Sequence, residues 1–202
     1  MVKQEEFTVE LVDAENKKSF KEHVSLDGKT FYIEVEPDVE YFVRVGSDRK
    51  PVIVEVIVDG EDLGTTFCIN NCGFGLMDLT SRRNGKLQIT ALKIENARFS
   101  PKDTTDIKPV FWTGNVTAIY YERFDTGEYT VKKDHECPWQ PHDIVAYVEG
   151  LSNLKHKKGV RTGKGDTIIE KEEHKKKRLP KKGRKLCSIT VNYCTAVGAY
   201  LC

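Results

Sequence analysis

The chain has 202 residues, of which 39% are hydrophobic and 31% charged, and its 32 basic and 31 acidic side chains give a formal net charge of +1. This length suits one domain with a substantial core, and the apolar content excludes a wholly disordered protein. No apolar run approaches the roughly 18 residues of a membrane-spanning helix, and the first ten residues, MVKQEEFTVE, lack a secretory signal, so we expect an intracellular protein that contacts no membrane.

The first 150 residues alternate between apolar and polar positions, as half-buried strands do. Residues 31–36 alternate clearly, and residues 52–58 (VIVEVIV) are apolar on both faces except at Glu55, which predicts a strand inside a sheet. Further strands are expected at 87–94, 116–121 and 144–148. The dipeptides Asp27-Gly28, Asp59-Gly60 and Asn84-Gly85 favour tight hairpins because they accept positive φ.

A helical pattern is weak throughout the chain. Its best example is the mostly charged segment 166–177, where only Ile168 and Ile169 are apolar. The sequence therefore predicts an all-β protein, an antiparallel β-sandwich with a jelly-roll-like arrangement.

Three strand-and-turn motifs resemble those of a known family. They are residues 40–45 (EYFVRV), 52–64 (VIVEVIVDGEDLG) and 112–120 (WTGNVTAIY), and they are similar to motifs of an uncharacterised β-sandwich domain family known mainly from fungi. The resemblance covers about residues 30–125 and implies a β-sandwich. That family has no established activity, so the resemblance implies no catalytic residues.

The charge is divided between two parts of the chain. Residues 154–186 hold 14 Lys or Arg and 4 Asp or Glu, a net of +10, whereas the other 169 residues hold 18 and 27, a net of −9. The sequence predicts a sandwich body over 1–153 and a flexible basic insertion or loop over 154–186, since Pro180 and Gly183 break regular structure and like charges repel. Residues 187–202 are expected to bring a last strand, 187–193, back to the sandwich.

The basic segment has three interpretations: a solvated linker, a nuclear-import address (KKKRLPKK) or a binding element for a polyanion. We expect binding, because Lys and Arg neutralise phosphates and release counterions without reading sequence. No aromatic residue lies between Leu154 and Leu186, so base stacking by this segment is not expected. The expected contacts are Lys155, Lys157, Lys158, Arg161, Lys164, Lys175, Lys176, Lys177, Arg178, Lys181, Lys182, Arg184 and Lys185.

The sequence thus favours a non-enzymatic interaction module that contacts a nucleic-acid backbone or an acidic protein surface. Because the body is acidic, the same segment could also bind the body of another copy. The alternative is a structural assembly protein, such as a jelly-roll component of a particle.

Six cysteines raise the question of metal or thiol chemistry. Zinc could take Cys68 and Cys72 with a second set from His135, Cys137 and His142, but this spacing matches no standard zinc frame. We expect free thiols in a reducing compartment and no cofactor. A zinc- or thiol-dependent enzyme is the less favoured alternative. Trp139, which lies between Cys137 and His142, is expected to pack on the core.

Overall fold

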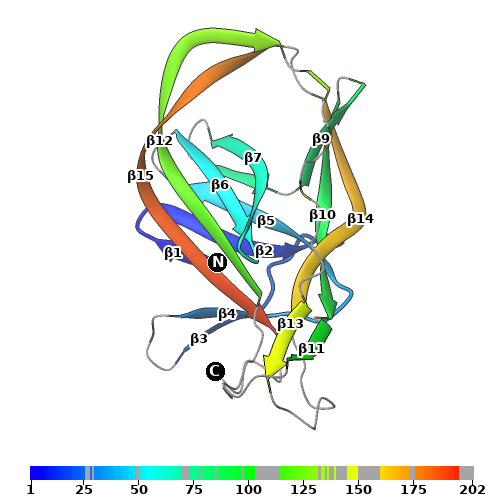
Figure 1. Cartoon of the computed structure of the whole chain (residues 1–202). Helices are drawn as coiled ribbons and strands as arrows, with labels where there is room; N and C mark the ends of the chain where they lie inside the picture. The colour runs from blue at the N-terminus through cyan, green and yellow to red at the C-terminus, as the bar shows by residue number, and fades with distance from the viewer. Residues whose placement is uncertain are drawn as a thin grey trace.

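The computed structural model describes residues 1–25, 28, 30–48, 51–69, 73–77, 79–84, 86–96, 98–102, 114–131, 133–134, 136, 139, 145–149, 160–172 and 176–195. These residues form strands and their connections (Figure 1). None of the described residues belongs to a helix that could cross a membrane. The expected all-β class is confirmed.

Two sheets, antiparallel except for one parallel pair in the second, pack against each other, and we call them sheet one and sheet two. Sheet one has the order β1 (Val2–Gln4), β2 (Phe7–Asp13), β5 (Glu40–Ser47), β10 (Lys86–Asn96) and β14 (Val160–Glu172), with β8 (Gly73–Met77) beside β5 and β9 (Leu79–Arg83) beside β10. Sheet two has the order β3 (Glu22–Val24), β4 (Phe31–Glu34), β15 (Lys176–Cys194), β12 (Gly114–Val131), β6 (Val52–Val58) and β7 (Glu61–Ile69). A separate parallel pair joins β11 (Arg98–Lys102) and β13 (Val145–Glu149).

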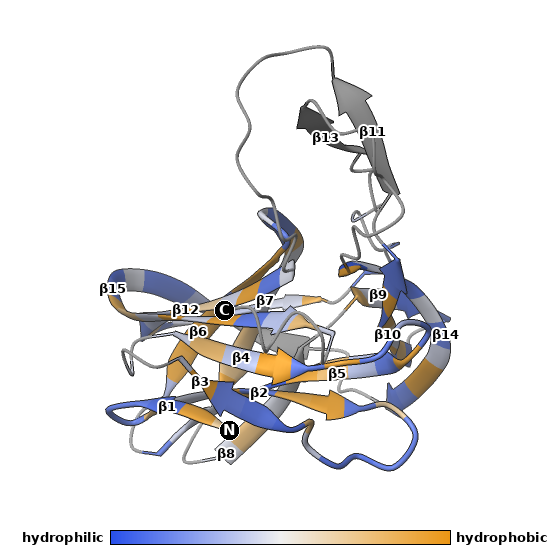
Figure 2. Cartoon of the chain, turned by 90° about the horizontal axis from the view of Figure 1, so that it is seen from below, coloured by the Kyte–Doolittle hydropathy of each residue, from blue (hydrophilic) through white to orange (hydrophobic). Residues whose placement is uncertain are grey.

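The core lies between the two sheets and consists largely of β-branched and aromatic side chains. Val54, Val56 and Val58 of β6 are fully buried, as are Val43 and Val45 of β5. Figure 2 shows the hydrophobic residues of β2, β4, β5 and β6 in the body of the molecule. The expected interior position of residues 52–58 is confirmed, because β6 pairs with β12 on one side and with β7 on the other.

The turn chemistry agrees with the sequence where the structure describes it. Asp59 and Gly60 have φ values of 51° and 84° between β6 and β7, as a hairpin turn with two positive-φ residues requires. Gly28 and Asn84 also have positive φ, whereas their partners Asp27 and Gly85 lie outside the described residues. Trp139 is buried in the main core cluster, as expected.

The C-terminal strand returns to the sandwich, as the sequence predicts. Residues 187–193 belong to β15, which pairs antiparallel with β12 and, at its end, parallel with β4. Ile189 and Val191 are buried in the core. Residues 187–194 are therefore part of sheet two.

The expected loop over 154–186 is wrong wherever the structure describes it. Residues 160–172 form β14 and residues 176–186 form the first half of β15, so the weak helical pattern at 166–177 produces no helix in the described residues. A charged segment becomes a strand here because long partner strands satisfy its backbone: β14 pairs with β10 and β15 with β12. The boundary expected at residue 153 fails for the same reason, since β14 completes sheet one.

Candidate polyanion interface

Strands β12 and β15 are much longer than their neighbours and continue together past the sandwich. In Figure 1, β12 (green) and β15 (orange) run side by side and curve across the top of the view. Residues 116–122 of β12 lie between β15 and β6, but residues 123–131 pair with β15 alone. We define the basic ribbon as residues 121–131 of β12 together with residues 176–186 of β15.

The basic ribbon is mostly exposed and strongly charged. Burial alternates along β12 up to Tyr120, and the side chains of residues 124–129 are exposed. The ribbon carries eight Lys or Arg and three Asp or Glu, a net charge of +5. Seven of the eight cations lie on β15, so one strand of the pair presents a row of positive residues.

A bulge in β12 bends the ribbon. The register passes from Asp125↔Pro180 to Tyr129↔Arg178, so β12 has two extra residues at this point. The Asp125 carboxylate accepts the N–H of Gly127 at 3.0 Å, and Gly127 has a φ of 74°. Because bulges increase local twist and bend the strand that carries them, this turn accounts for the curvature.

Two cations fix the base of the ribbon to acidic side chains. Lys182 Nζ lies 2.7 Å from Glu55 Oε1 on β6 and 4.4 Å from the centre of the Tyr121 ring. The hydrogen bond to Glu55 raises the pKa of Lys182. Arg184 Nε donates to Glu122 Oε1 at 2.8 Å. Lys182 therefore links the ribbon to β6 of the body, whereas Arg184 links the two strands of the ribbon to each other.

Two other cations on the same strand are exposed without an acidic partner in the described part of the chain. Lys181 and Lys185 are exposed, and neither forms an ion pair within the described part of the chain. Lys176, Lys177 and Arg178 continue the row, with backbones opposite Val131, Thr130 and Tyr129. The basic ribbon thus holds positive residues at strand spacing beyond the end of the sandwich.

The remaining expected contacts have mixed outcomes. Lys164 is exposed on β14. Arg161 was expected at the interface, but it is buried and pairs with Glu95 at 3.0 Å, because β14 joins sheet one at this point. Lys155, Lys157, Lys158 and Lys175 lie outside the described residues.

Aromatic side chains of β12 contribute to the ribbon, which the sequence analysis missed. The rings of Phe124 and Tyr129 are 53% and 59% exposed. Phe124 lies opposite Lys181 and covers Gly183, where an added Cβ would be 2.5 Å from the ring. The sequence contained these aromatics in FDTGEY, but only the strand pairing brings Phe124 opposite Lys181 and Tyr129 opposite Arg178.

The zinc hypothesis gains no support from the described residues. Cys72, His135, Cys137 and His142 lie outside them, and Cys68 is a half-buried free thiol opposite Ile53. No group of three potential metal ligands occurs within the described part of the chain. Cys187 and Cys194 are both buried.

A buried polar chain joins the two sheets away from the ribbon. Tyr41 and Thr162 of sheet one and Tyr193 of sheet two connect through two hydroxyl contacts of 2.6 Å. The Tyr193 hydroxyl donates to the Asp59 carboxylate, with O–O distances of 2.8 and 2.7 Å. Asp59 also accepts the backbone N–H groups of Asn115 and Thr162. Every side chain in this hydrogen-bonded series has a partner, which favours a structural role. The four residues are Tyr41, Asp59, Thr162 and Tyr193.

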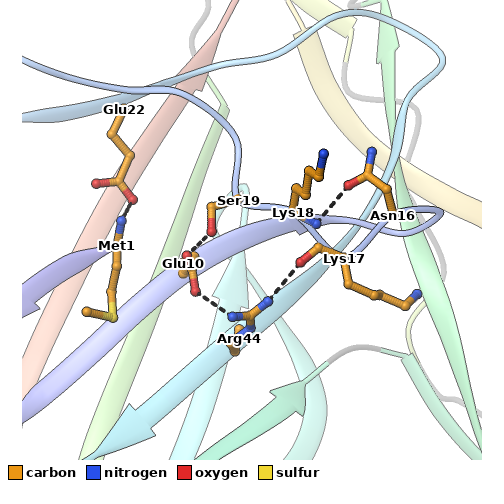
Figure 3. A network of polar contacts seen from close by, with 8 residues as sticks. All are labelled: Met1, Glu10, Asn16, Lys17, Lys18, Ser19, Glu22 and Arg44. Carbon is orange, nitrogen blue, oxygen red and sulfur yellow. Dashed lines mark hydrogen bonds and ion pairs between the residues drawn. The ribbon is translucent and has the colours of Figure 1, made fainter.

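A second polar cluster, on the outer face of sheet one, is also structural (Figure 3). Glu10 lies opposite Arg44 in the register of β2 and β5, with 3.2 Å between their charged groups. Arg44 also donates to the backbone carbonyl of Lys17, and Ser19 donates to Glu10. This cluster holds the connection after β2 against the sheet.

Comparisons with protein-family models, curated proteins and solved structures find no match. The similarity to a fungal domain family therefore stays a prediction from the sequence, and the candidate function depends on the geometry of the ribbon.

Proposed function

We propose that this chain is a non-enzymatic binding module whose basic ribbon contacts a polyanion without reading its sequence. The observation that carries the proposal is the row of cations on β15, paired with β12 beyond the sandwich. A strand fixes the spacing of these cations in advance, so binding a chain of phosphates costs less conformational entropy than ordering a loop would.

Folding does not account for all of this charge. Lys182 and Arg184 have acidic partners at the base of the ribbon, but Lys181 and Lys185 face solvent. The net charge of +5 on the ribbon repels itself, which opposes the ribbon's own stability. An anionic partner would remove this repulsion and release its condensed counterions.

The test compares the double variant Lys181→Gln/Lys185→Gln with Lys18→Gln/Lys86→Gln, which removes the same charge from exposed positions on the body. Binding to fluorescein-labelled DNA is followed by anisotropy, and retention on heparin by salt elution. We expect the wild-type affinity to fall steeply between about 0.05 and 0.2 M salt. The ribbon variant should bind more weakly, and its log–log salt slope on duplex DNA should decrease by about 0.9 for each lysine that contacts a phosphate.

The proposal fails if the wild type binds neither DNA nor heparin at low salt. It also fails if the two double variants bind equally well. Circular dichroism and a melting curve establish that each variant is folded.

A further inference from the structure

The exposed ring of Phe124 suggests which polyanion the ribbon binds. It is 53% exposed and lies on the same strand as Tyr129, which is 59% exposed. It lies outside both core clusters and contacts Gly183 on the neighbouring strand. The ring therefore keeps a large part of its surface available to a partner.

An exposed cation lies directly beside this ring. Phe124 and Lys181 are register partners on β12 and β15, and opposite residues in an antiparallel pair project to the same face with Cβ atoms about 5 Å apart. The ring offers an aromatic surface and the ammonium group offers a positive charge within one short stretch of the ribbon. A nucleotide has the complementary groups, a flat base and a phosphate.

Resting on the proposed function, we infer that the ligand of the ribbon is single-stranded nucleic acid, with a base stacked on Phe124 and its phosphate backbone along the β15 cations. In a duplex the bases already stack on one another, so a ring can reach them only by unstacking a step. A single strand has free base faces, and stacking on an aromatic side chain tolerates any sequence. An acidic protein surface would use the cations but would gain no stacking from the ring.

The chain provides a closely matched control. Phe74 on β8 is 60% exposed and covers Gly46, its register partner on β5, much as Phe124 covers Gly183. Phe74 lies on sheet one, away from β12 and β15. Leucine at either position keeps an apolar side chain over the glycine but has no flat aromatic face.

The experiment measures the dissociation constants of Phe124→Leu, Phe124→Tyr and Phe74→Leu for three probes: an oligothymidylate of about 20 nucleotides, a duplex of the same length and heparin, which has no bases. We expect the wild type to bind the single strand more tightly than the duplex at equal salt. Phe124→Leu should weaken single-strand binding roughly five- to hundredfold and leave heparin binding unchanged. Phe124→Tyr, which keeps an aromatic ring, should bind the single strand as the wild type does. Phe74→Leu should match the wild type on every probe.

The outcomes separate this inference from the proposed function. If Phe124→Leu binds the single strand as well as the wild type, or if the duplex binds more tightly, the stacking assignment is wrong while polyanion binding stands. If the wild type binds none of the three probes, the proposed function fails and the inference fails with it. Equal melting temperatures for the variants show that a loss of binding does not come from unfolding.

Discussion

Asp59 ends a directed chain of hydrogen bonds between the sheets. A carboxylate only accepts, so the Tyr193 hydroxyl donates to Asp59, Thr162 donates to Tyr193, and Tyr41 donates to Thr162. Burial raises the pKa of Asp59 and raises the pKa of Tyr193 well above its ordinary value. Gly114 makes room for this arrangement, because a Cβ there would lie 1.9 Å from the Tyr193 ring.

Replacing Asp59 by asparagine should lower the free energy of unfolding at neutral pH by about 1–3 kcal/mol. Its carboxylate oxygens accept the N–H groups of Asn115 and Thr162 separately, so an amide nitrogen would face one of these donors. Urea unfolding at neutral pH measures the loss. Asp62→Asn, on an exposed residue of the same hairpin, is the control and should cost much less.

The pH dependence of stability should also change in Asp59→Asn. The folded-state pKa of Asp59 is raised, so the folded protein holds a proton that the unfolded chain has already lost. The free energy of unfolding therefore falls as the pH rises from the ordinary aspartate pKa through the raised one. Glu34 has the opposite effect on the pH dependence of stability, because the hydrogen bond from His23 lowers the pKa of Glu34. The difference between wild type and variant isolates Asp59, and parallel pH profiles would contradict its raised pKa.

At the scale of elements, strands were predictable where their own side chains enter the core. Residues 52–58 are almost continuously apolar and form β6, and residues 187–193 alternate between apolar and polar positions and belong to β15. Both segments contribute buried valines to the core. β14 and the first half of β15 were missed because their polar sequences carry no such pattern. Their strand structure comes from pairing with β10 and β12, and single-chain periodicity does not contain that information.

The basic ribbon was likewise only partly predictable from the sequence. The cations were visible as a charge run, but their arrangement as a strand and the neighbouring ring of Phe124 depend on the pairing of β12 with β15. Arg161 was placed in the same group by its charge, although it lies opposite Glu95 in sheet one and pairs with it. Composition therefore located the charge, while partner strands decided which residues are exposed.

Protection against hydrogen exchange should decrease along β12. Residues 116–122 have a strand on both sides, whereas residues 123–131 have only β15, and an isolated pair of strands is marginally stable in water. Amides of β12 that bond to β15 should therefore exchange faster in the ribbon than in the sandwich, through local opening. Exchange followed by mass spectrometry or NMR measures this gradient. Equal protection along the strand would mean that the ribbon opens only when the sandwich unfolds.

At the scale of the whole molecule, the chain passes repeatedly between the two sheets. β1 and β2 lie in sheet one, β3 and β4 in sheet two, β5 in sheet one, and β6 and β7 in sheet two; later, β12, β14 and β15 alternate in the same way. Neither sheet can form from one continuous segment. The Tyr120 hydroxyl adds a direct link, because it donates to the Thr8 carbonyl of sheet one at 2.6 Å.

This topology should make the sandwich unfold as one unit even though the chain exceeds the size at which intermediates become common. When one sheet opens, the core face of the other sheet is exposed to water, so the two sheets should unfold together. Far-UV circular dichroism follows the strands and near-UV circular dichroism follows the buried tyrosines. The two signals should therefore give the same denaturation midpoint. The calorimetric and van't Hoff enthalpies should agree. Refolding should take milliseconds to seconds or longer, because the strand pairs are distant in sequence. Two separate midpoints would show that one sheet survives alone, which would contradict a core shared between the sheets.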